Sequence, residues 1–227
     1  MSEDNRHEIT MRAYVLGSFV IKYNLPMKMI DEINKAYDEA SDLEKWNDRL
    51  AGKIAEENLV NDLMTDKMKE IFLGCFQAYM KHIQKPYWIP TLNTVWINEM
   101  RANEYNPFHF HQSPMTDLGL SSVLMLKKPS TYGKEYSREE SPSNGMLEFT
   151  GGQQDPLSIP QNRVDAKVGE LYVFPYTLLH GVYPFNGTDE VRRTMSYNCN
   201  LYNPAVVQQV RDQQMKEADK NAKNENV

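Results

Sequence analysis

His109 and His111 are separated by a single residue in the segment 106–111. Side chains two positions apart in a strand point to the same face, so a strand here would direct both imidazoles to one side. Phe108 and Phe110 would then face the other side and pack there. Imidazole nitrogens are common metal ligands, and two that converge begin a metal site. The segment therefore predicts a metal centre that needs further ligands from another part of the chain.

His180 is the candidate for the third ligand. It ends the apolar stretch 170–180, which Pro175 interrupts, so His180 is expected at the start of a new strand. A single histidine in such a place is more often a surface or core residue than a ligand. The metal hypothesis therefore depends on the order and strand context of all three histidines together.

Arg192 follows His180 by twelve residues, after a turn at 186–189. Strand alternation places Arg192, Thr194, Ser196 and Asn198 on one face. Arg193 lies on the opposite face, where it is expected to point outward. A planar guanidinium pairs with a carboxylate through two parallel hydrogen bonds, and a neighbouring hydroxyl adds a donor. This strand thus predicts a carboxylate-binding site inside a barrel.

Strands must position these residues, and two helical segments precede them. Apolar residues at helical spacing predict amphipathic helices over 27–40 and from about 59 to 83. From Pro86 onward, short β-branched and aromatic runs are separated by Gly, Pro, Asn and Ser, which is typical of antiparallel strands. The expected strands are 92–100, 107–111, 120–127, 146–150, 171–174, 178–183 and 192–201.

The number and even spacing of these strands indicate a jelly-roll sandwich or barrel with helices packed on it, so the fold class is α+β. We expect one domain over 1–205, with a helical N-terminal part at 1–85 and a β-barrel core at 86–205. A helical or frayed tail follows at 206–227. The loops 127–144 and 151–165 are expected to cover the mouth of the barrel.

The balance of charge argues against nucleic acid as a partner. Lys and Arg total 25 against 31 Asp and Glu, a net charge of −6, whereas nucleic-acid binders carry a basic surface. No stretch reaches the roughly 18 apolar residues of a membrane span, so we expect a cytoplasmic protein without a membrane partner. Cys75 and Cys199 lack metal-binding spacing and are expected to be reduced thiols. The oligomeric state stays open.

Taken in chain order, the residues above resemble the 2-oxoglutarate/iron(II) oxygenase superfamily. The matching elements are His109-x-His111, Ser121-Ser122-Val123, Gly169, Phe174-Pro175, His180 and Arg192-x-Thr194-x-Ser196-x-Asn198. A closer resemblance is to a branch of these oxygenases whose pattern begins with a Trp-x-Asn strand, here Trp96-Ile97-Asn98. The resemblance covers about 91–203, roughly half of the chain, and leaves out the helical N-terminal part.

The resemblance implies a double-stranded β-helix barrel, a jelly roll, that holds one iron(II) ion. By position, the iron ligands would be His109, His111 and His180. The distal carboxylate of 2-oxoglutarate would bind Arg192, with Thr194 or Ser196 as an auxiliary hydroxyl. The implied activity is that of a dioxygenase that uses molecular oxygen, releases succinate and CO2, and hydroxylates a small molecule or a protein side chain.

The chain departs from the commonest pattern of the superfamily at one ligand. That pattern is HxD followed by a distant histidine, a facial triad of two histidines and one carboxylate. Here His111 stands where the aspartate would be, and Asp117, in the insertion 112–119, is the alternative third ligand. We favour His111 over Asp117. Residues two apart in a strand point to the same face, so His111 can join His109 without a rearrangement of the loop.

Two other functions are compatible with the same residues. A cupin-like metal enzyme that does not use 2-oxoglutarate would also place several histidines in a β-barrel, but would give Arg192 no fixed role. A barrel that serves only as a binding module would keep the pocket without the chemistry.

Overall fold

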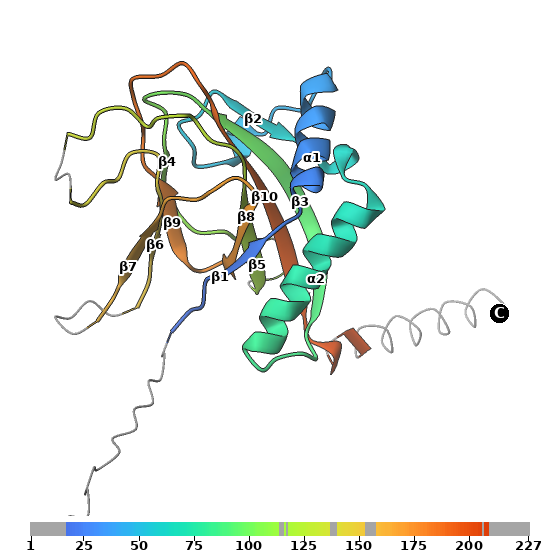
Figure 1. Cartoon of the computed structure of the whole chain (residues 1–227). Helices are drawn as coiled ribbons and strands as arrows, with labels where there is room; N and C mark the ends of the chain where they lie inside the picture. Colours follow the sequence, from blue (N-terminus) through green and yellow to red (C-terminus); the bar gives the residue numbers. More distant parts are fainter. Residues whose placement is uncertain are drawn as a thin grey trace, which may run out of the picture.

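The computed structural model of the protein describes residues 17–113, 116, 118–136, 140–152, 158–205 and 207–208. Two antiparallel sheets face each other, and two helices, α1 (Met27–Glu39) and α2 (Asp66–His82), pack on the outer side of the larger sheet (Figure 1). This two-sheet arrangement is a jelly roll, and most of its regular structure is β.

The larger sheet has the strand order β1-β8-β5-β10-β3-β2. Its strands are β1 (Ile21–Asn24), β8 (Glu170–Pro175), β5 (Gly119–Lys127), β10 (Arg192–Tyr202), β3 (Ile89–Met100) and β2 (Glu56–Leu59). The smaller sheet has the order β4-β9-β6-β7. Its strands are β4 (Asn106–His109), β9 (Leu179–Val182), β6 (Leu147–Thr150) and β7 (Gln161–Val164). Two short 3-10 helices, η1 (Asn47–Arg49) and η2 (Asn61–Leu63), flank β2.

Three strands were missed by the sequence analysis, and all lie at edges of the sheets. β1 and β2 come from the N-terminal part that was expected to be helical, and they form the two edges of the larger sheet. β7, the edge of the smaller sheet, lies inside the stretch 151–165 that was expected to be a loop. These edge strands are only four residues long. β2 and β7 are mostly polar, and the alternation in β1 is too short to mark a strand in a sequence.

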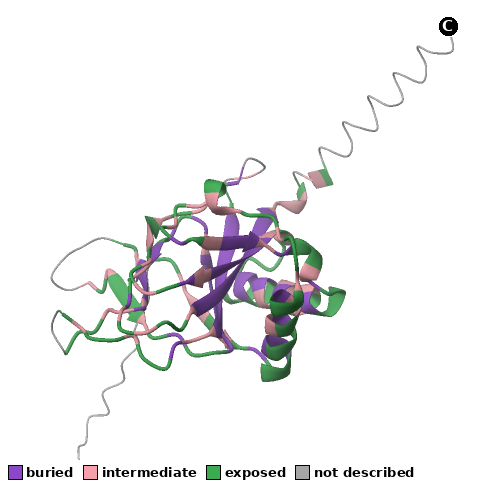
Figure 2. Ribbon diagram, turned by 90° about the horizontal axis from the view of Figure 1, so that it is seen from above, coloured by how far each residue is buried: buried purple, intermediate pink, exposed green. Residues whose placement is uncertain are grey.

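The main core lies between the larger sheet and the helices. Buried side chains gather on the central strands and on the helix sides that face them (Figure 2). Alternation along β10 sends Met195, Tyr197 and Cys199 into this core, while Thr194 and Ser196 face the smaller sheet. One strand therefore divides its side chains between a packed core and the barrel interior.

α2 starts seven residues later than the expected beginning at about 59. Residues 56–59 are the strand β2, and Thr65 is the N-cap of the helix, where its side-chain oxygen accepts a hydrogen bond from the Met68 backbone N–H at 3.3 Å. α1 ends one residue short of the expected limit. Within the described residues, no helix combines the length and the apolar composition that a bilayer crossing requires.

Arg193 does not point outward as the sequence analysis expected. Its side chain is 4% exposed, because α1 covers this part of the larger sheet. The guanidinium donates to Glu99 at 2.7 Å, to Asn34 at 3.0 Å and to Asp38 at 2.6 Å, and it lies 4.5 Å from the centroid of the Tyr37 ring. The pKa of Asp38 is lowered, chiefly by the hydrogen bond from Arg193. Arg193 thus ties α1 to the sheet.

We expect Arg193→Met to lower the free energy of unfolding by about 3 kcal/mol, since it leaves Glu99 and Asp38 without their common partner. Urea unfolding followed by circular dichroism measures the change. Arg101→Met is the matched control, because its ion pair with Glu56 is exposed and worth at most about 1 kcal/mol. Equal effects of the two substitutions would show that Arg193 does not hold α1 in place.

Candidate metal centre

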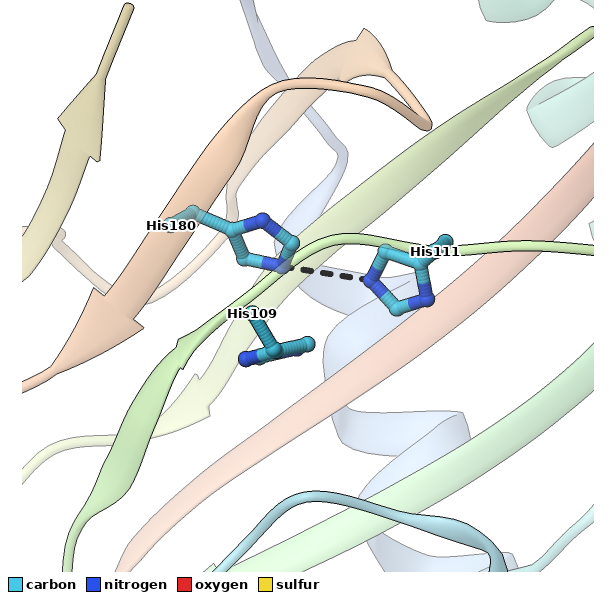
Figure 3. Close-up of side chains that lie close together, drawn as sticks. All are labelled: His109, His111 and His180. Carbon is cyan, nitrogen blue, oxygen red and sulfur yellow. Dashed lines mark hydrogen bonds between the residues drawn. The ribbon is translucent and has the colours of Figure 1, made fainter.

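Two of the three candidate histidines are direct neighbours across a pair of strands. His109 ends β4 and is paired in register with His180, the second residue of β9. Figure 3 shows these two side chains and His111 converging, and their ligand nitrogens all lie within 4.8 Å of one another. The three imidazoles could therefore hold a metal ion.

His111 reaches the cluster in a different way from the one expected. β4 ends at His109, so His111 lies beyond the strand. The backbone N–H of His111 donates to the carbonyl oxygen of Tyr176 at 2.9 Å, which ties this residue to the turn before β9. Phe108 and Phe110 are not buried, since they are 47% and 52% exposed, although the Phe108 ring makes an edge-to-face contact with Tyr183 at 6.5 Å between centroids.

Two backbone hydrogen bonds select the tautomer of His109 and His180. His109 Nδ1 lies 2.7 Å from the carbonyl oxygen of Pro107, and His180 Nδ1 lies 2.9 Å from that of Leu178. A carbonyl oxygen only accepts, so each Nδ1 must carry the proton and donate. The Nε2 lone pairs are then free for a ligand, as in metal-binding histidines whose second nitrogen is held by a backbone carbonyl.

The cluster favours the neutral imidazoles that metal binding needs. Burial lowers the pKa of His109 and lowers that of His180 to about 3. For His111, burial and the two neighbouring histidines hold the pKa well below its ordinary value. His111 Nε2 lies 3.2 Å from His180 Nε2. Two nitrogens bound at right angles to one ion, each at about 2.1 Å, are roughly 3 Å apart, so this spacing suits a shared ion.

Aromatic rings from the larger sheet surround the imidazoles. The Phe174 ring centroid lies 4.5 Å from that of His180, and the Trp96 centroid lies 5.9 Å from that of His111. These contacts limit ring rotation and keep water from one side of the cluster. The site is therefore both positioned and partly desolvated before any ion binds.

The predicted carboxylate-binding residues lie on the same side of the barrel. Thr194 and Ser196 line an interior cavity together with the three histidines. Arg192 shares their face of β10 and is fully buried. Its Nε donates to the carbonyl oxygen of Gly145 at 3.1 Å, and its Nη2 has no partner among the described residues.

Arg192 forms no ion pair with any described carboxylate, and burial lowers its pKa. Tyr132 and the charge of Asp165 act in the opposite direction and raise the pKa of Arg192, but Asp165 forms its ion pair with Lys128. The Tyr132 hydroxyl is buried without a hydrogen-bond partner within the described part. A buried cation without a counter-ion is costly. Arg192 and Tyr132 are therefore the residues that could hold an anionic group.

Sequence reasoning missed several polar residues of the interior. Tyr132 lies in a loop and gave no signal, while Asn98 was part of the matched pattern but received no role. The Oδ1 atoms of Asn98 and Asn106 are buried without a described partner, and both residues line the cavity with the histidines. Asp117, the alternative ligand, lies outside the described residues, as does most of the tail 206–227.

A larger pocket of about 600 Å³ opens beside His109 and His111. Its lining residues are Trp46, Arg49, Leu50, Ala51, Asn93, Thr94, Trp96, His109, Phe110, His111, Gln112, Ser113 and Asn198. The loops 127–144 and 151–165, expected to cover the barrel mouth, contribute none of its described lining residues. The segment 46–51, for which no role was expected, forms one wall instead.

Residues 94–198 match the sequence model of the family described as "Putative 2OG-Fe(II) oxygenase". This segment covers a little under half of the chain. It contains the three histidines, Arg192, Thr194 and Ser196. The protein is an oxygenase, and the matching family uses iron(II) and 2-oxoglutarate.

Solved structures support the fold of the oxygenase. A prolyl-4-hydroxylase from Pseudomonas putida is 12% identical, with a TM-score of 0.51 over 80% of this chain and 91% of that chain. The non-haem α-ketoglutarate-dependent epimerase SnoN of nogalamycin biosynthesis is 14% identical, with a TM-score of 0.55 over 80% of this chain and 78% of its own. A prolyl hydroxylase from Trichoplax adhaerens is 10% identical, with a TM-score of 0.51 over 81% and 83%.

No curated protein is similar enough in sequence to count as a relative of the oxygenase. The family match does not favour a cupin-like enzyme without 2-oxoglutarate or a barrel that only binds. The residues of the oxygenase also fit the two cofactors. Three neutral imidazoles with free nitrogens suit iron(II), and the unpartnered Nη2 of Arg192 suits a carboxylate.

Proposed function

We propose that this protein is an Fe(II)- and 2-oxoglutarate-dependent dioxygenase that hydroxylates its substrate and releases succinate and CO2. One observation carries the proposal: a single barrel interior contains both a cluster of three neutral imidazoles and a buried guanidinium without a carboxylate partner. A metal site alone would not require the guanidinium, and a carboxylate site alone would not require the imidazoles. A metal-chelating dicarboxylate uses both.

His109, His111 and His180 are the proposed iron ligands. The backbone bonds that fix the tautomers of His109 and His180, and the position of His111 beside them, support this assignment. Three neutral ligands leave the ion one unit more positive than a triad with a carboxylate. Asp117 is the alternative to His111, and metal content of the two single variants distinguishes them.

Arg192 is the proposed partner of the distal carboxylate of 2-oxoglutarate. Its unpartnered Nη2, together with Nη1, offers the fork that a carboxylate matches. Thr194 or Ser196 adds a hydroxyl from the same face of β10, and the Tyr132 hydroxyl is a further donor. The bound carboxylate would give the buried guanidinium of Arg192 the counter-ion that it otherwise lacks.

When bound, iron(II) and 2-oxoglutarate supply the oxidising power, as 2-oxoglutarate and O2 are converted to succinate, CO2 and an oxygen atom inserted into the substrate. The residues of the chain orient the reactants and exclude water. Phe174 and Trp96 hold the imidazole rings in place. The pocket beside His109 and His111 admits the substrate to one side of the cluster.

The substrate class is a small molecule or a protein side chain. SnoN has been solved in complex with Fe3+, α-ketoglutarate and nogalamycin RO, whereas the Trichoplax adhaerens enzyme has been solved with a peptide fragment of hypoxia inducible factor. A pocket of about 600 Å³ accommodates a small molecule or one side chain of a peptide. Molecular oxygen is the second reactant.

The proposal is tested by loading the protein with Fe(II) under anaerobic conditions and titrating it with 2-oxoglutarate. We expect one iron per chain, metal-dependent binding of 2-oxoglutarate, and succinate formation on admission of oxygen. Succinate yield and oxygen uptake with candidate substrates are the measurements. Protein that carries its iron but neither binds nor decarboxylates 2-oxoglutarate would contradict the proposal.

A further inference from the structure

The pocket beside the histidines has walls from two different parts of the chain. His109, Phe110 and His111 belong to the family segment 94–198. The opposite wall is the segment 46–51, which lies between α1 and β2 and outside that match. The segment 46–51 therefore contributes to the pocket from outside the part of the chain that matches the family.

The segment 46–51 is anchored at both ends. The Trp46 backbone N–H donates to the carbonyl oxygen of Glu57 in β2 at 2.8 Å, and the Lys53 backbone N–H donates to that of Tyr105 at 2.9 Å. Between these points the Asn47 side chain donates to the carbonyl oxygen of Ile54 at 2.7 Å. Backbone bonds at both ends hold the wall in place beside the pocket without a ligand.

Among the described residues that line this pocket, Arg49 is the only lysine, arginine, aspartate or glutamate. The other lining groups are amides, hydroxyls, apolar and aromatic side chains. No ion pair joins Arg49 to a described carboxylate, although the protein as a whole carries a net charge of −6. The pocket is therefore a local cationic site in an acidic protein.

The guanidinium of Arg49 lies 5.3 Å from the centroid of the Trp46 ring. A cation–π contact of this kind uses the face of the guanidinium and leaves its N–H edges free for a planar anion. The same pocket contains the buried Oδ1 of Asn198, which has no described partner, and Trp96 offers an apolar surface beside His111. The lining thus combines an exposed cationic side chain, an apolar wall and a hydrogen-bond acceptor.

We propose, on the basis of the function proposed above, that the oxygenase acts on small molecules that carry an anionic group, a carboxylate or a phosphate. Arg49 binds this group at the mouth of the pocket, and the apolar part of the substrate lies along Trp46 and Trp96 toward the histidines. Arg49 is then a specificity-determining residue. It takes no part in binding iron or 2-oxoglutarate, because these groups are assigned to the barrel interior.

The test uses the protein loaded with Fe(II) and saturating 2-oxoglutarate without oxygen. Three probes of similar shape are titrated, with the tryptophan fluorescence of the pocket as the signal: 3-phenylpropionate, phenethyl phosphate and the neutral 3-phenylpropionamide. We expect at least one anionic probe to bind about tenfold or more tightly than the amide, as charge-assisted hydrogen bonds imply. The better of the two anions identifies the group as carboxylate or phosphate.

Arg49→Gln should bring the anionic probes and the amide to nearly equal affinity, and Arg49→Lys should restore part of the preference. Arg101→Gln is the matched control, because Arg101 is exposed and lies outside the lining of the pocket. Wild-type protein that binds anion and amide equally, or binds none of the probes, would overturn the proposal. So would a preference that survives Arg49→Gln.

Iron content and 2-oxoglutarate affinity are measured on every variant. Normal values with no preference among the probes would contradict the role of Arg49 alone. Wild-type protein that does not bind iron or 2-oxoglutarate would instead contradict the proposed function. The probe titration can then be repeated on the metal-free protein. The two failures are therefore distinguishable.

Discussion

His180→Ala is expected to leave the protein folded but unable to retain iron. His180 is 3% exposed, is paired with His109 across β4 and β9, and has its Nε2 free for the ion. Loss of residues that only orient a ligand costs about 10- to 100-fold in metal affinity or activity, so loss of a ligand should cost more than about 100-fold. Iron content after anaerobic loading and desalting measures the effect, and succinate formation should fall with it.

Two further substitutions separate loss of the ligand from loss of the fold. His180→Gln keeps much of the side-chain volume, and circular dichroism with thermal unfolding reports whether either variant is folded. His82→Ala is the matched control, because His82 is exposed at the end of α2 on the far side of the larger sheet. Folded His180→Ala protein with one iron per chain would rule out the histidine cluster as the metal site.

The same assay decides between His111 and Asp117. If three histidines hold the iron, His111→Ala loses it and Asp117→Ala keeps it, whereas the reverse pattern would assign the ligand to Asp117. His111→Asp should retain iron, since it restores the two-histidine, one-carboxylate set that suits iron(II).

Arg192→Met is expected to abolish tight binding of 2-oxoglutarate without loss of iron. Truncation of a buried, hydrogen-bonded charge costs about 2–5 kcal/mol, which is roughly 30-fold to several thousandfold in affinity. The ligand-free variant should also be as stable as the wild type or more stable, because an apolar side chain replaces an unpaired buried cation. Calorimetric titration with 2-oxoglutarate and urea unfolding measure the two effects.

Ligand-induced stabilisation gives a second readout for Arg192. At a concentration of 2-oxoglutarate one hundred times its Kd, the wild type should gain about 2.7 kcal/mol in free energy of unfolding, and Arg192→Met should gain little at the same concentration. Arg101→Met serves again as the exposed control. Unchanged affinity in Arg192→Met would give Arg192 no cofactor role and would favour a metal enzyme that does not use 2-oxoglutarate.

The strands β3, β5, β8 and β10 could be predicted because each is long enough, or apolar enough, to show its pattern locally. β3, β5, β8 and β10 contribute side chains to the main core, so their residues must alternate or be apolar throughout. β1, β2 and β7 could not be predicted in this way. They are short edge strands whose polar side chains find partners only in the folded protein, such as Lys22 in β1 with Glu170 at 2.8 Å.

The pair His109 and His111 shows which information is local in the sequence and which depends on the fold. The candidate site residues could be identified from the sequence by their types, by the two-residue spacing and by their order relative to His180 and Arg192. This was possible because strand alternation is a local property of the backbone. His111 lies beyond β4, however, and its place depends on the backbone bond to Tyr176. No local pattern encodes a contact between residues so far apart in the chain.

The sequence by itself determined the jelly-roll class, the candidate ligands and the strand that carries Arg192, Thr194 and Ser196. The tertiary structure alone decided that Arg193 is buried under α1, that Tyr132 lies beside Arg192, and that the segment 46–51 rather than the expected loops lines the pocket. The physical reason is the same in each case. Alternation sets the face to which a side chain points, but what covers that face depends on packing between segments that are distant in sequence.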